Sequence, residues 1–435
     1  MRRMFNAVLH PQTLKYVPQF PGSMAAAPDR MKRWFAQKWV LDNIIRVIGV
    51  EWDQGRIAYS ISIAGSADGT VELRQVASRV RRWSDIHREY LKVAMRKEKL
   101  AKASEEEGHY VTSREHYFWA SIFYAFATWP IHDDNHPNLV MCHERKNHCY
   151  DKVIRYAPHP MERVEIPFEG KSIAAILHKP SGSEGRKLPW VISIPGMDVF
   201  KELMHPLYGD KFLERGFGVL SVDGPGIGES LNPKRKIPLT EDNFAKAGRA
   251  CIDYLKTRKD VDPENICVYG VSMGSFWAVQ VASYNNEQLR ATAVSMPCFE
   301  PGHKTLLNSA SPSFKMRYMF MTNIYDEKEF DAFASKLSVK GLGRKITKPF
   351  MIVAGEDDEL APITDAYAFF EELAGPKKML TYEGEIHALP NVYWLHIVAD
   401  FLHDRVSGKP MTSDSIYVDT MGREVPGWTP FKPSI

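Results

Sequence analysis

The sequence predicts an α/β protein, in which a mostly parallel sheet of eight strands carries helices on both faces and follows a helical region. From about residue 162, short apolar segments alternate with segments of helical character, the order that produces a parallel sheet covered on both sides. From about 70 to 130, apolar residues instead recur at helical spacing. The sequence therefore predicts two structural units, the first of them helical.

Composition excludes several classes of protein. The chain of 435 residues is longer than a usual single domain. Its net charge of +3 is too small to indicate a nucleic-acid partner, and its sequence has no run of 18 apolar residues that would predict a membrane span. Five cysteines and no apolar signal segment favour a reducing compartment. We expect a cytoplasmic protein that acts on a small molecule, with no nucleic-acid or membrane partner.

The helical region contains one unusually aromatic segment. Residues 1 to about 40 hold several prolines and are expected to form an irregular arm. Segment 114–129 is apolar on almost every side, which predicts a helix buried on most faces. Thr112 or Ser113 is expected to cap this helix, and Pro130 to end it.

The aromatic side chains of this helix have two interpretations. The simpler one is packing between helices. The other is that Tyr117, Trp119 and Tyr124 line a substrate pocket, because rings with one polar atom suit an apolar pocket that needs a few orienting groups. Both interpretations can hold for different faces of the helix.

Two patterns that resemble cofactor sites do not predict one. Cys142-His143 and His148-Cys149 gather soft metal ligands, but the sequence has no second knuckle to complete a zinc site. The glycine-rich run 224–228 follows a strand, but Pro225 interrupts it and no dinucleotide spacing follows. We therefore expect no metal and no cofactor.

The sheet begins with an antiparallel hairpin across Glu169-Gly170 and continues as parallel strands. Segment 297–345 is too long for a simple connection and predicts a helical insert that acts as a lid or cap. The tail after Gly408 is expected to lie across the surface. The predicted strands are 163–168, 171–179, 189–194, 217–223, 266–269, 291–296, 350–354 and 379–382. The predicted domains are a helical cap domain over 1–155, an α/β catalytic domain over 156–405 that includes the insert, and a tail over 406–435.

The pattern Gly-x-Ser-x-Gly at 270–274 lies between an apolar strand and a helical segment. A serine hydroxyl is a weak nucleophile at neutral pH and needs exposure, a nearby base and donors for the oxyanion that it creates. A sharp strand-to-helix turn exposes Ser272, and the N–H of Met273 points at the developing charge from the helix N-terminus. Ser272 is the candidate nucleophile.

A carboxylate and an imidazole follow later in the chain, each just after a strand. Asp358 lies in Gly-Glu-Asp-Asp-Glu, and His387 follows the strand that ends near Tyr382. The order Ser, Asp, His predicts a catalytic triad at the carboxyl edge of the sheet. His387 would take the proton of Ser272 and Asp358 would orient the imidazole, with Asp357 as the second candidate for that role.

The second oxyanion donor is expected after the strand 189–194. Gly196 allows the backbone to bend toward the nucleophile, and the N–H of Met197 is the candidate donor. The predicted oxyanion hole is therefore formed by Met197 and Met273.

Together these motifs resemble those of an α/β hydrolase. Pro-Gly-Met-Asp-x-x-Lys-Glu (195–202), Asp-Gly-Pro-Gly-Ile-Gly-Glu-Ser (223–230), the serine turn and Gly-Glu-Asp-Asp-Glu (355–359) are similar to the esterase-like family of the fermentation/respiration switch protein. That family includes dihydroxypseudooxynicotine hydrolase and fungal hydrolases that shorten pigment polyketides. The resemblance covers about 70–405 and implies a helical cap over the site and a homodimer.

Two reactions are compatible with this site. If the leaving group is an alkoxide, the protein is an esterase; if it is an enolate or aryl carbanion, the protein hydrolyses a carbon–carbon bond of a β-diketone or aryl ketone. The aromatic helix favours a bulky, partly aromatic substrate, and we place ester hydrolysis first. A binding or regulatory protein on a hydrolase scaffold is the third interpretation.

Overall fold

A computed structural model describes residues 67–302 and 312–425, together with several positions between 39 and 49. The irregular arm that the sequence predicts at the N-terminus falls almost entirely outside these residues. Within the described residues, no helix combines the length and the apolar character that crossing a membrane requires.

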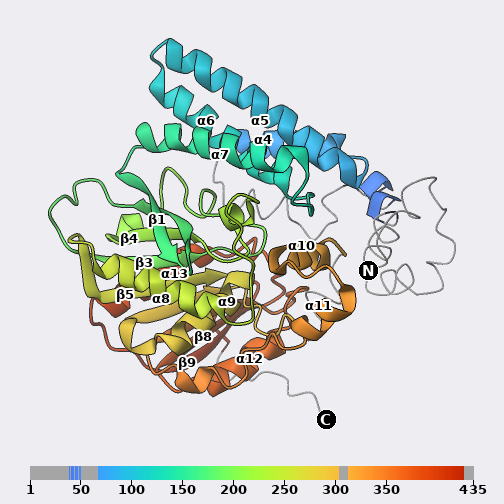
Figure 1. Ribbon diagram of the computed structural model, residues 1–435. Helices are drawn as coiled ribbons and strands as arrows, with labels where there is room; N and C mark the ends of the chain where they lie inside the picture. The colour runs from blue at the N-terminus through green and yellow to red at the C-terminus, as the bar shows by residue number, and fades with distance from the viewer. Residues whose placement is uncertain are drawn as a thin grey trace.

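Between residues 67 and 155, four helices precede the sheet and form a layer along one side of the α/β body (Figure 1). They are α4 (Ala67–Arg79), α5 (Trp83–Glu106), α6 (Tyr110–Thr128) and α7 (Pro137–Arg155). The apolar stripe of α5 is buried, and α6 packs between α5 and α7. The predicted cap of α6 was wrong, because the helix begins at Tyr110 and its N-cap position is held by His109. Gly108, with a φ of 78°, turns the chain just before that residue.

Across the described ranges, the sheet has nine strands in the order β1-β2-β4-β3-β5-β6-β7-β8-β9. β1 and β4 both pair antiparallel with β2, and all other pairs are parallel. The strands are β1 (Met161–Phe168), β2 (Lys171–His178), β3 (Leu188–Ile194), β4 (Gly218–Asp223), β5 (Val261–Val271), β6 (Ala291–Ser295), β7 (Phe350–Gly355), β8 (Lys377–Tyr382) and β9 (Asp414–Val418). The first eight confirm the predicted strands.

The ninth strand corrects the expectation that the tail lies across the surface. β9 pairs parallel with β8, whose outer edge would otherwise present unpaired N–H and C=O groups. Tyr417 is buried there and donates a hydrogen bond to Glu356 at 2.7 Å. The sequence did not predict β9 because this segment has only five residues and lies within a polar tail.

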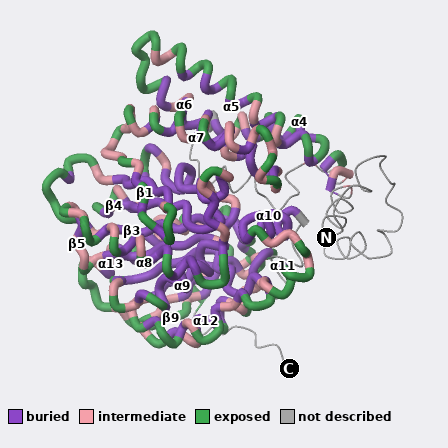
Figure 2. The backbone as a smooth tube through the Cα atoms, in the orientation of Figure 1, coloured by how far each residue is buried: buried purple, intermediate pink, exposed green. Residues whose placement is uncertain are grey.

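Successive residues of each central strand face opposite sides of the sheet and enter separate cores. Ile192 and Val268 belong to the core beneath α8 and α9, whereas Val191 and Cys267 belong to the core beneath α13. This period of two fixes the sheet between two layers of helices. Figure 2 shows the strands buried and the outer helix faces exposed. The later helices are α8 (Asn243–Lys256), α9 (Met273–Tyr284), α12 (Ile363–Glu372) and α13 (Trp394–Val406).

The connection between β6 and β7 carries helices α10 (Pro312–Thr322) and α11 (Glu327–Ala334). Helical structure was predicted for this insert, and both helices lie within it. The loop from β4 contacts the insert directly, because the N–H of Leu239 donates to the carbonyl of Met321 at 2.9 Å. The role of the insert as a lid and the division into domains stay predictions.

Candidate active site

The turn between β5 and α9 holds Ser272 in a strained conformation. Its φ is 55° and its ψ is −125°, a region that residues other than glycine rarely occupy and that costs on the order of 1–3 kcal/mol. Glycines flank it because the backbones are crowded: a Cβ on Gly274 would lie 2.4 Å from the carbonyl oxygen of Ile194. The turn thus directs the serine hydroxyl away from the sheet edge.

The structure brings Ser272, His387 and Asp358 into one hydrogen-bonded series. Ser272 Oγ lies 2.7 Å from His387 Nε2, and His387 Nδ1 lies 2.7 Å from Asp358 Oδ2. The side chains of His387 and Asp358 are each only 2% exposed. Low exposure strengthens these contacts because little water competes for them.

Asp358, rather than the second candidate Asp357, contacts the imidazole. The other oxygen of Asp358 accepts hydrogen bonds from the N–H groups of Leu360 and Ala361 at 2.9 and 2.8 Å. These bonds stabilise the carboxylate as an anion and fix its direction toward His387.

Opposing effects act on the basicity of His387. Burial by itself would lower the pKa of the imidazole, but the charge of Asp358, its hydrogen bond and the charge of Glu359 outweigh burial. The pKa of His387 therefore lies above the ordinary value of 6.5. A more basic imidazole accepts the serine proton more readily.

Both proposed oxyanion donors lie beside Ser272. Met197 and Met273 line the same cavity as the serine and His387. Met273 is the first residue of α9, so its N–H has no acceptor within the helix. Gly196 brings the preceding loop close, since a Cβ there would lie 3.1 Å from the Cβ of Ser272.

Replacing Gly196 with Ala tests how closely this loop must approach. The added methyl would also lie 3.2 Å from the carbonyl oxygen of Val271, so the loop carrying Met197 must move by a few tenths of an ångström. We expect kcat to fall about tenfold with an unchanged melting temperature, because small displacements of catalytic groups are costly. Steady-state kinetics and thermal unfolding measure the two effects. An unchanged kcat would contradict the placement of the oxyanion loop.

Apart from Ser272, His387 and Asp198, the residues that line the cavity at Ser272 are apolar. Its remaining walls include Met296, Phe314, Leu360 and Trp394. Phe314 comes from α10 of the insert and Trp394 from the start of α13. Neither residue was predicted from the sequence. The apolar character of α10 was the one signal that could have indicated Phe314.

The structure places the three aromatic residues proposed for substrate binding in the helix packing instead. Tyr117 donates a hydrogen bond to Glu105 at 2.7 Å, and Tyr124 donates one to Glu98 at 2.8 Å. Trp119 is buried, 3% exposed, between helices. None of the three lines the cavity at Ser272 or the second cavity beside it, which is described below. Tyr117 and Tyr124 thus bond to α5, and the ring of Trp119 lies against Gly69 of α4. Core packing is the interpretation that these contacts support.

A second cavity lies between the helical layer and the α/β body. It shares Asp198 and Val199 with the cavity at Ser272. From the aromatic helix and its end it receives Phe126 and Trp129 rather than the predicted residues. Successive residues of a helix are rotated by about 100° around its axis, so neighbours in the sequence lie on different faces. When all faces are apolar, the sequence does not reveal which of them meets a cavity.

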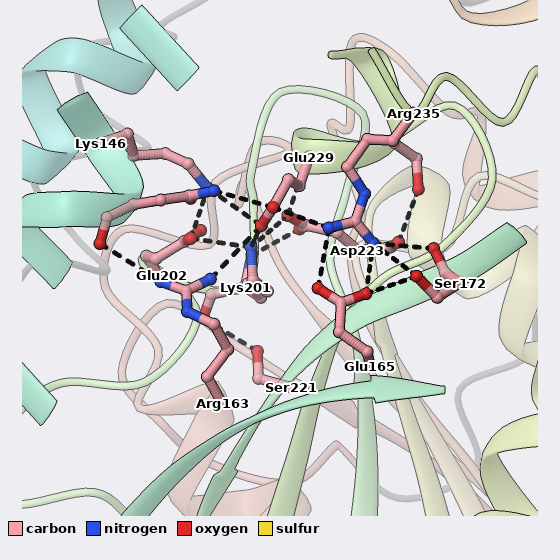
Figure 3. A network of polar contacts seen from close by, with 12 residues as sticks. Lys146, Arg163, Glu165, Ser172, Lys201, Glu202, Ser221, Asp223, Glu229 and Arg235 are labelled. Atoms are coloured by element: carbon pink, nitrogen blue, oxygen red, sulfur yellow. Dashed lines mark hydrogen bonds and ion pairs between the residues drawn. The ribbon is translucent and has the colours of Figure 1, made fainter. Parts of the chain in front are cut away.

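Next to this cavity lies a buried ionic network (Figure 3). The ammonium of Lys201 is within 2.8 Å of Glu202 Oε1, 2.9 Å of Asp223 Oδ2 and 2.7 Å of Glu229 Oε2. Lys201 and Glu202 are 0% exposed. Burial by itself would lower the pKa of Lys201, but the three carboxylates reverse this effect and raise it. The lysine is therefore held as a cation.

Further cations complete the network. Lys146 of α7 pairs with Glu202, and Arg163 and Arg235 pair with Glu229 at 3.4 and 3.0 Å. Burial would raise the pKa of Glu202, but Lys146, Lys201 and Arg163 lower it to about 2. The network joins the helical layer to the sheet, because its members come from α7, β1, the loop after β3, the end of β4 and the loop that follows β4.

The carboxylates of Glu202, Asp223 and Glu229 lie close enough to hold a metal ion. The ammonium of Lys201 already occupies the position among them. The network instead fixes the loop that carries Met197, since the N–H of Lys201 donates to Asp223 Oδ1 at 2.8 Å. These residues are therefore positioned to hold the loop that carries Met197.

Comparison with known proteins agrees with this architecture. A profile of FrsA-like esterases matches residues 53–379. Esterase FrsA of Photobacterium profundum is 25% identical over 208 residues, covering 48% of this chain and 48% of that protein. The alpha/beta hydrolase ucsC of Acremonium sp is 25% identical over 289 residues, covering 62% of this chain and 56% of that protein. The chain thus matches about half the length of these curated relatives.

A solved structure matches over more of the fold. The crystal structure of the 2,6-dihydroxy-pseudo-oxynicotine hydrolase superposes with a TM-score of 0.69 at 21% identity. The superposition covers 82% of this chain and 98% of that one, so it includes the helical layer as well as the sheet. Because the family profile spans most of the sequence, this chain belongs to the FrsA-like esterase family of α/β hydrolases.

Proposed function

We propose that this protein is a serine hydrolase that attacks a carbonyl carbon of a bulky, partly aromatic small molecule. Ser272 is the nucleophile, His387 the general base and acid, and Asp358 the residue that orients the imidazole. The observation that carries the proposal is the series of 2.7 Å contacts from Asp358 through His387 to Ser272, with the serine on a strained strand-to-helix turn.

The reaction follows from this geometry. His387 Nε2 accepts the hydroxyl proton as Ser272 Oγ bonds to the carbonyl carbon, and the carbonyl oxygen becomes an oxyanion. The N–H groups of Met197 and Met273 stabilise that oxyanion. The imidazolium then gives its proton to the leaving group as the bond to it breaks, which leaves an acyl-enzyme. Water, deprotonated by His387, releases the acid and restores the serine.

Ester hydrolysis is the first candidate reaction. In it the leaving oxygen takes the proton and departs as an alcohol. Membership in a family of FrsA-like esterases supports this choice. In the second candidate, a β-diketone or aryl ketone is cleaved, the leaving carbon takes the proton, and a ketone or arene departs. The name of the superposed hydrolase specifies no bond type, and the triad serves either leaving group.

A product-resolved screen separates the two reactions. Matched aryl esters and aryl β-diketones would be incubated with the enzyme, and the products identified by mass spectrometry. Ester turnover without ketone cleavage would remove the carbon–carbon proposal, and the reverse result would remove the esterase proposal. Turnover of neither, together with no labelling by a fluorophosphonate probe, would favour a non-catalytic binding or regulatory protein.

The pH dependence of kcat/KM tests the role of His387. Only the neutral imidazole can accept the serine proton, so activity should rise with pH through the pKa of His387. Because Asp358 holds that pKa above 6.5, the midpoint of the acid limb is expected above 6.5. Initial rates between about pH 5 and 9, in buffers of constant ionic strength, measure it. A midpoint below the ordinary histidine value would contradict the role of Asp358.

Cellular location and oligomeric state are the remaining parts of the proposal. All five cysteines are buried and free, which supports the proposed cytoplasmic location, where thiols stay reduced. The homodimer rests on the family resemblance alone, and sedimentation velocity would test it.

A further inference from the structure

The cavity between the helical layer and the α/β body has no role in the triad chemistry. It is enclosed by side chains from α5, α6, α7 and α10 and by the loop after β3. Its wall includes the aromatic side chains of Tyr90, Phe126, Trp129, Phe200 and Phe320. Apolar pockets of this kind bind small molecules when they also contain a few polar groups that orient the ligand.

His143 of α7 supplies such a group. It lines this cavity and is 4% exposed. Neither of its ring nitrogens has a hydrogen-bond partner among the described residues. Buried polar atoms are almost always paired, and an exception calls for a partner that binds there.

The other charged groups of the wall have ionic partners, either in the wall or in the neighbouring network. Lys146 pairs with Glu202, and Arg317 Nε lies 4.0 Å from Asp198 Oδ1. Among the residues that line this cavity, His143 is the one whose two ring nitrogens both lack a hydrogen-bond partner among the described residues.

We propose that His143 anchors a second substrate subsite, which takes an aromatic ring that carries a hydroxyl group. The aromatic wall contacts the ring, and the imidazole exchanges hydrogen bonds with the hydroxyl. This inference rests on the proposed function, because the subsite is assigned to the same substrate that reaches Ser272. Asp198 and Val199 line both cavities and form the boundary between them.

The chemistry of His143 selects a hydroxyl over an ion. Burial, with the neighbouring charge of Lys146, lowers the pKa of His143 to about 3, so the ring is neutral near pH 7. A neutral imidazole has one donor and one acceptor, which match the hydrogen and the oxygen of a hydroxyl. A carboxylate would add a buried charge where the nearby lysines and arginines are already paired, and such a charge is costly.

Matched substrates test this subsite. Phenyl esters and aryl β-diketones would be compared with analogues that carry one meta hydroxyl group on an aromatic ring. The quantity measured is the ratio of kcat/KM for the hydroxylated analogue to kcat/KM for the unsubstituted substrate. The wild-type protein should prefer a hydroxylated analogue by about 10- to 100-fold, since a site built to bind a hydroxyl discriminates against its absence. His143→Leu should reduce the ratio to below about threefold, because the hydroxylated analogue loses its hydrogen bond to the imidazole.

Two variants control for damage to the helix. His148→Leu makes the same change on the exposed side of α7 and should keep the wild-type preference. His143→Gln retains a donor and an acceptor and should keep most of it. An unaltered preference in His143→Leu, or equal losses on both substrates in a folded His143→Leu protein, would overturn the subsite.

A binding measurement separates this inference from the proposed reaction. The affinities of 2-naphthol and naphthalene would be measured by fluorescence for Ser272→Ala and for Ser272→Ala/His143→Leu. Tighter binding of 2-naphthol to the first variant alone supports the subsite even if no substrate in the screen is hydrolysed. Equal affinities of the two ligands for Ser272→Ala would overturn the subsite even if esters are hydrolysed.

Discussion

Replacing Ser272 with Ala is expected to lower kcat by about 10⁴- to 10⁶-fold, because no group remains to form the acyl-enzyme. The variant should fold about as well as the wild type. Alanine loses one hydrogen bond to His387, and the strained φ of 55° stays in place. KM or ligand affinity should change little, since the oxyanion donors and both cavities are preserved.

The measurement combines turnover with covalent labelling. A fluorophosphonate probe should modify the wild-type protein at Ser272, as peptide mass spectrometry would show, and should not modify the variant. Ser283→Ala is the matched control, because it lies on the same helix and its hydroxyl donates to the carbonyl of Gln280, within α9. It should retain both activity and labelling. Labelling of Ser272→Ala at another serine would refute the assignment of the nucleophile.

The sequence predicted the triad because each member follows a strand. Parallel strands end at a common edge, so Ser272 after β5, Asp358 after β7 and His387 after β8 are brought together by topology alone. The sequence favoured Asp358 over its neighbour Asp357, and it is Asp358 whose carboxylate lies 2.7 Å from His387 Nδ1.

Features that depend on the packing of distant elements were not predictable in the same way. Lys146 and Glu202 are separated by 56 residues, and neither lies in a pattern that indicates the other. Tyr117 and Tyr124 looked like pocket residues because the sequence of α6 is aromatic on several faces. Their partners, Glu105 and Glu98, come from the neighbouring helix α5. No local sequence pattern shows which residues of α5 lie opposite which residues of α6.

Lys201→Met is expected to destabilise the fold by at least about 3–5 kcal/mol at pH 7, because removing one partner leaves a buried charge uncompensated. Here the single ammonium contacts three carboxylates, of Glu202, Asp223 and Glu229. Methionine fills a similar volume, so the loss arises from charge rather than from a cavity. Because Lys201 also fixes the loop of Met197 through Asp223, kcat should fall as well.

Urea unfolding at pH 7 measures the free energy of unfolding for both proteins. Lys211→Met is the matched control, since that lysine forms an exposed ion pair with Glu214 at 3.0 Å. Exposed pairs contribute about 0–1 kcal/mol, so this change should have little effect. A loss of less than about 1 kcal/mol in Lys201→Met would contradict the role of the network.

The pH dependence distinguishes lost charge compensation from simple loss of packing. In the wild type, Lys146, Lys201 and Arg163 hold the pKa of Glu202 at about 2, below its ordinary value of 4.5. A depressed carboxylate pKa stabilises the fold fully above the ordinary value, and that stability is lost as pH falls toward about 2. Lys201→Met lacks the share of this stabilisation that the Lys201 charge supplies, whereas Lys146 and Arg163 remain. The difference in unfolding free energy between the two proteins should therefore shrink below the ordinary glutamate pKa, whereas a packing defect would leave it constant.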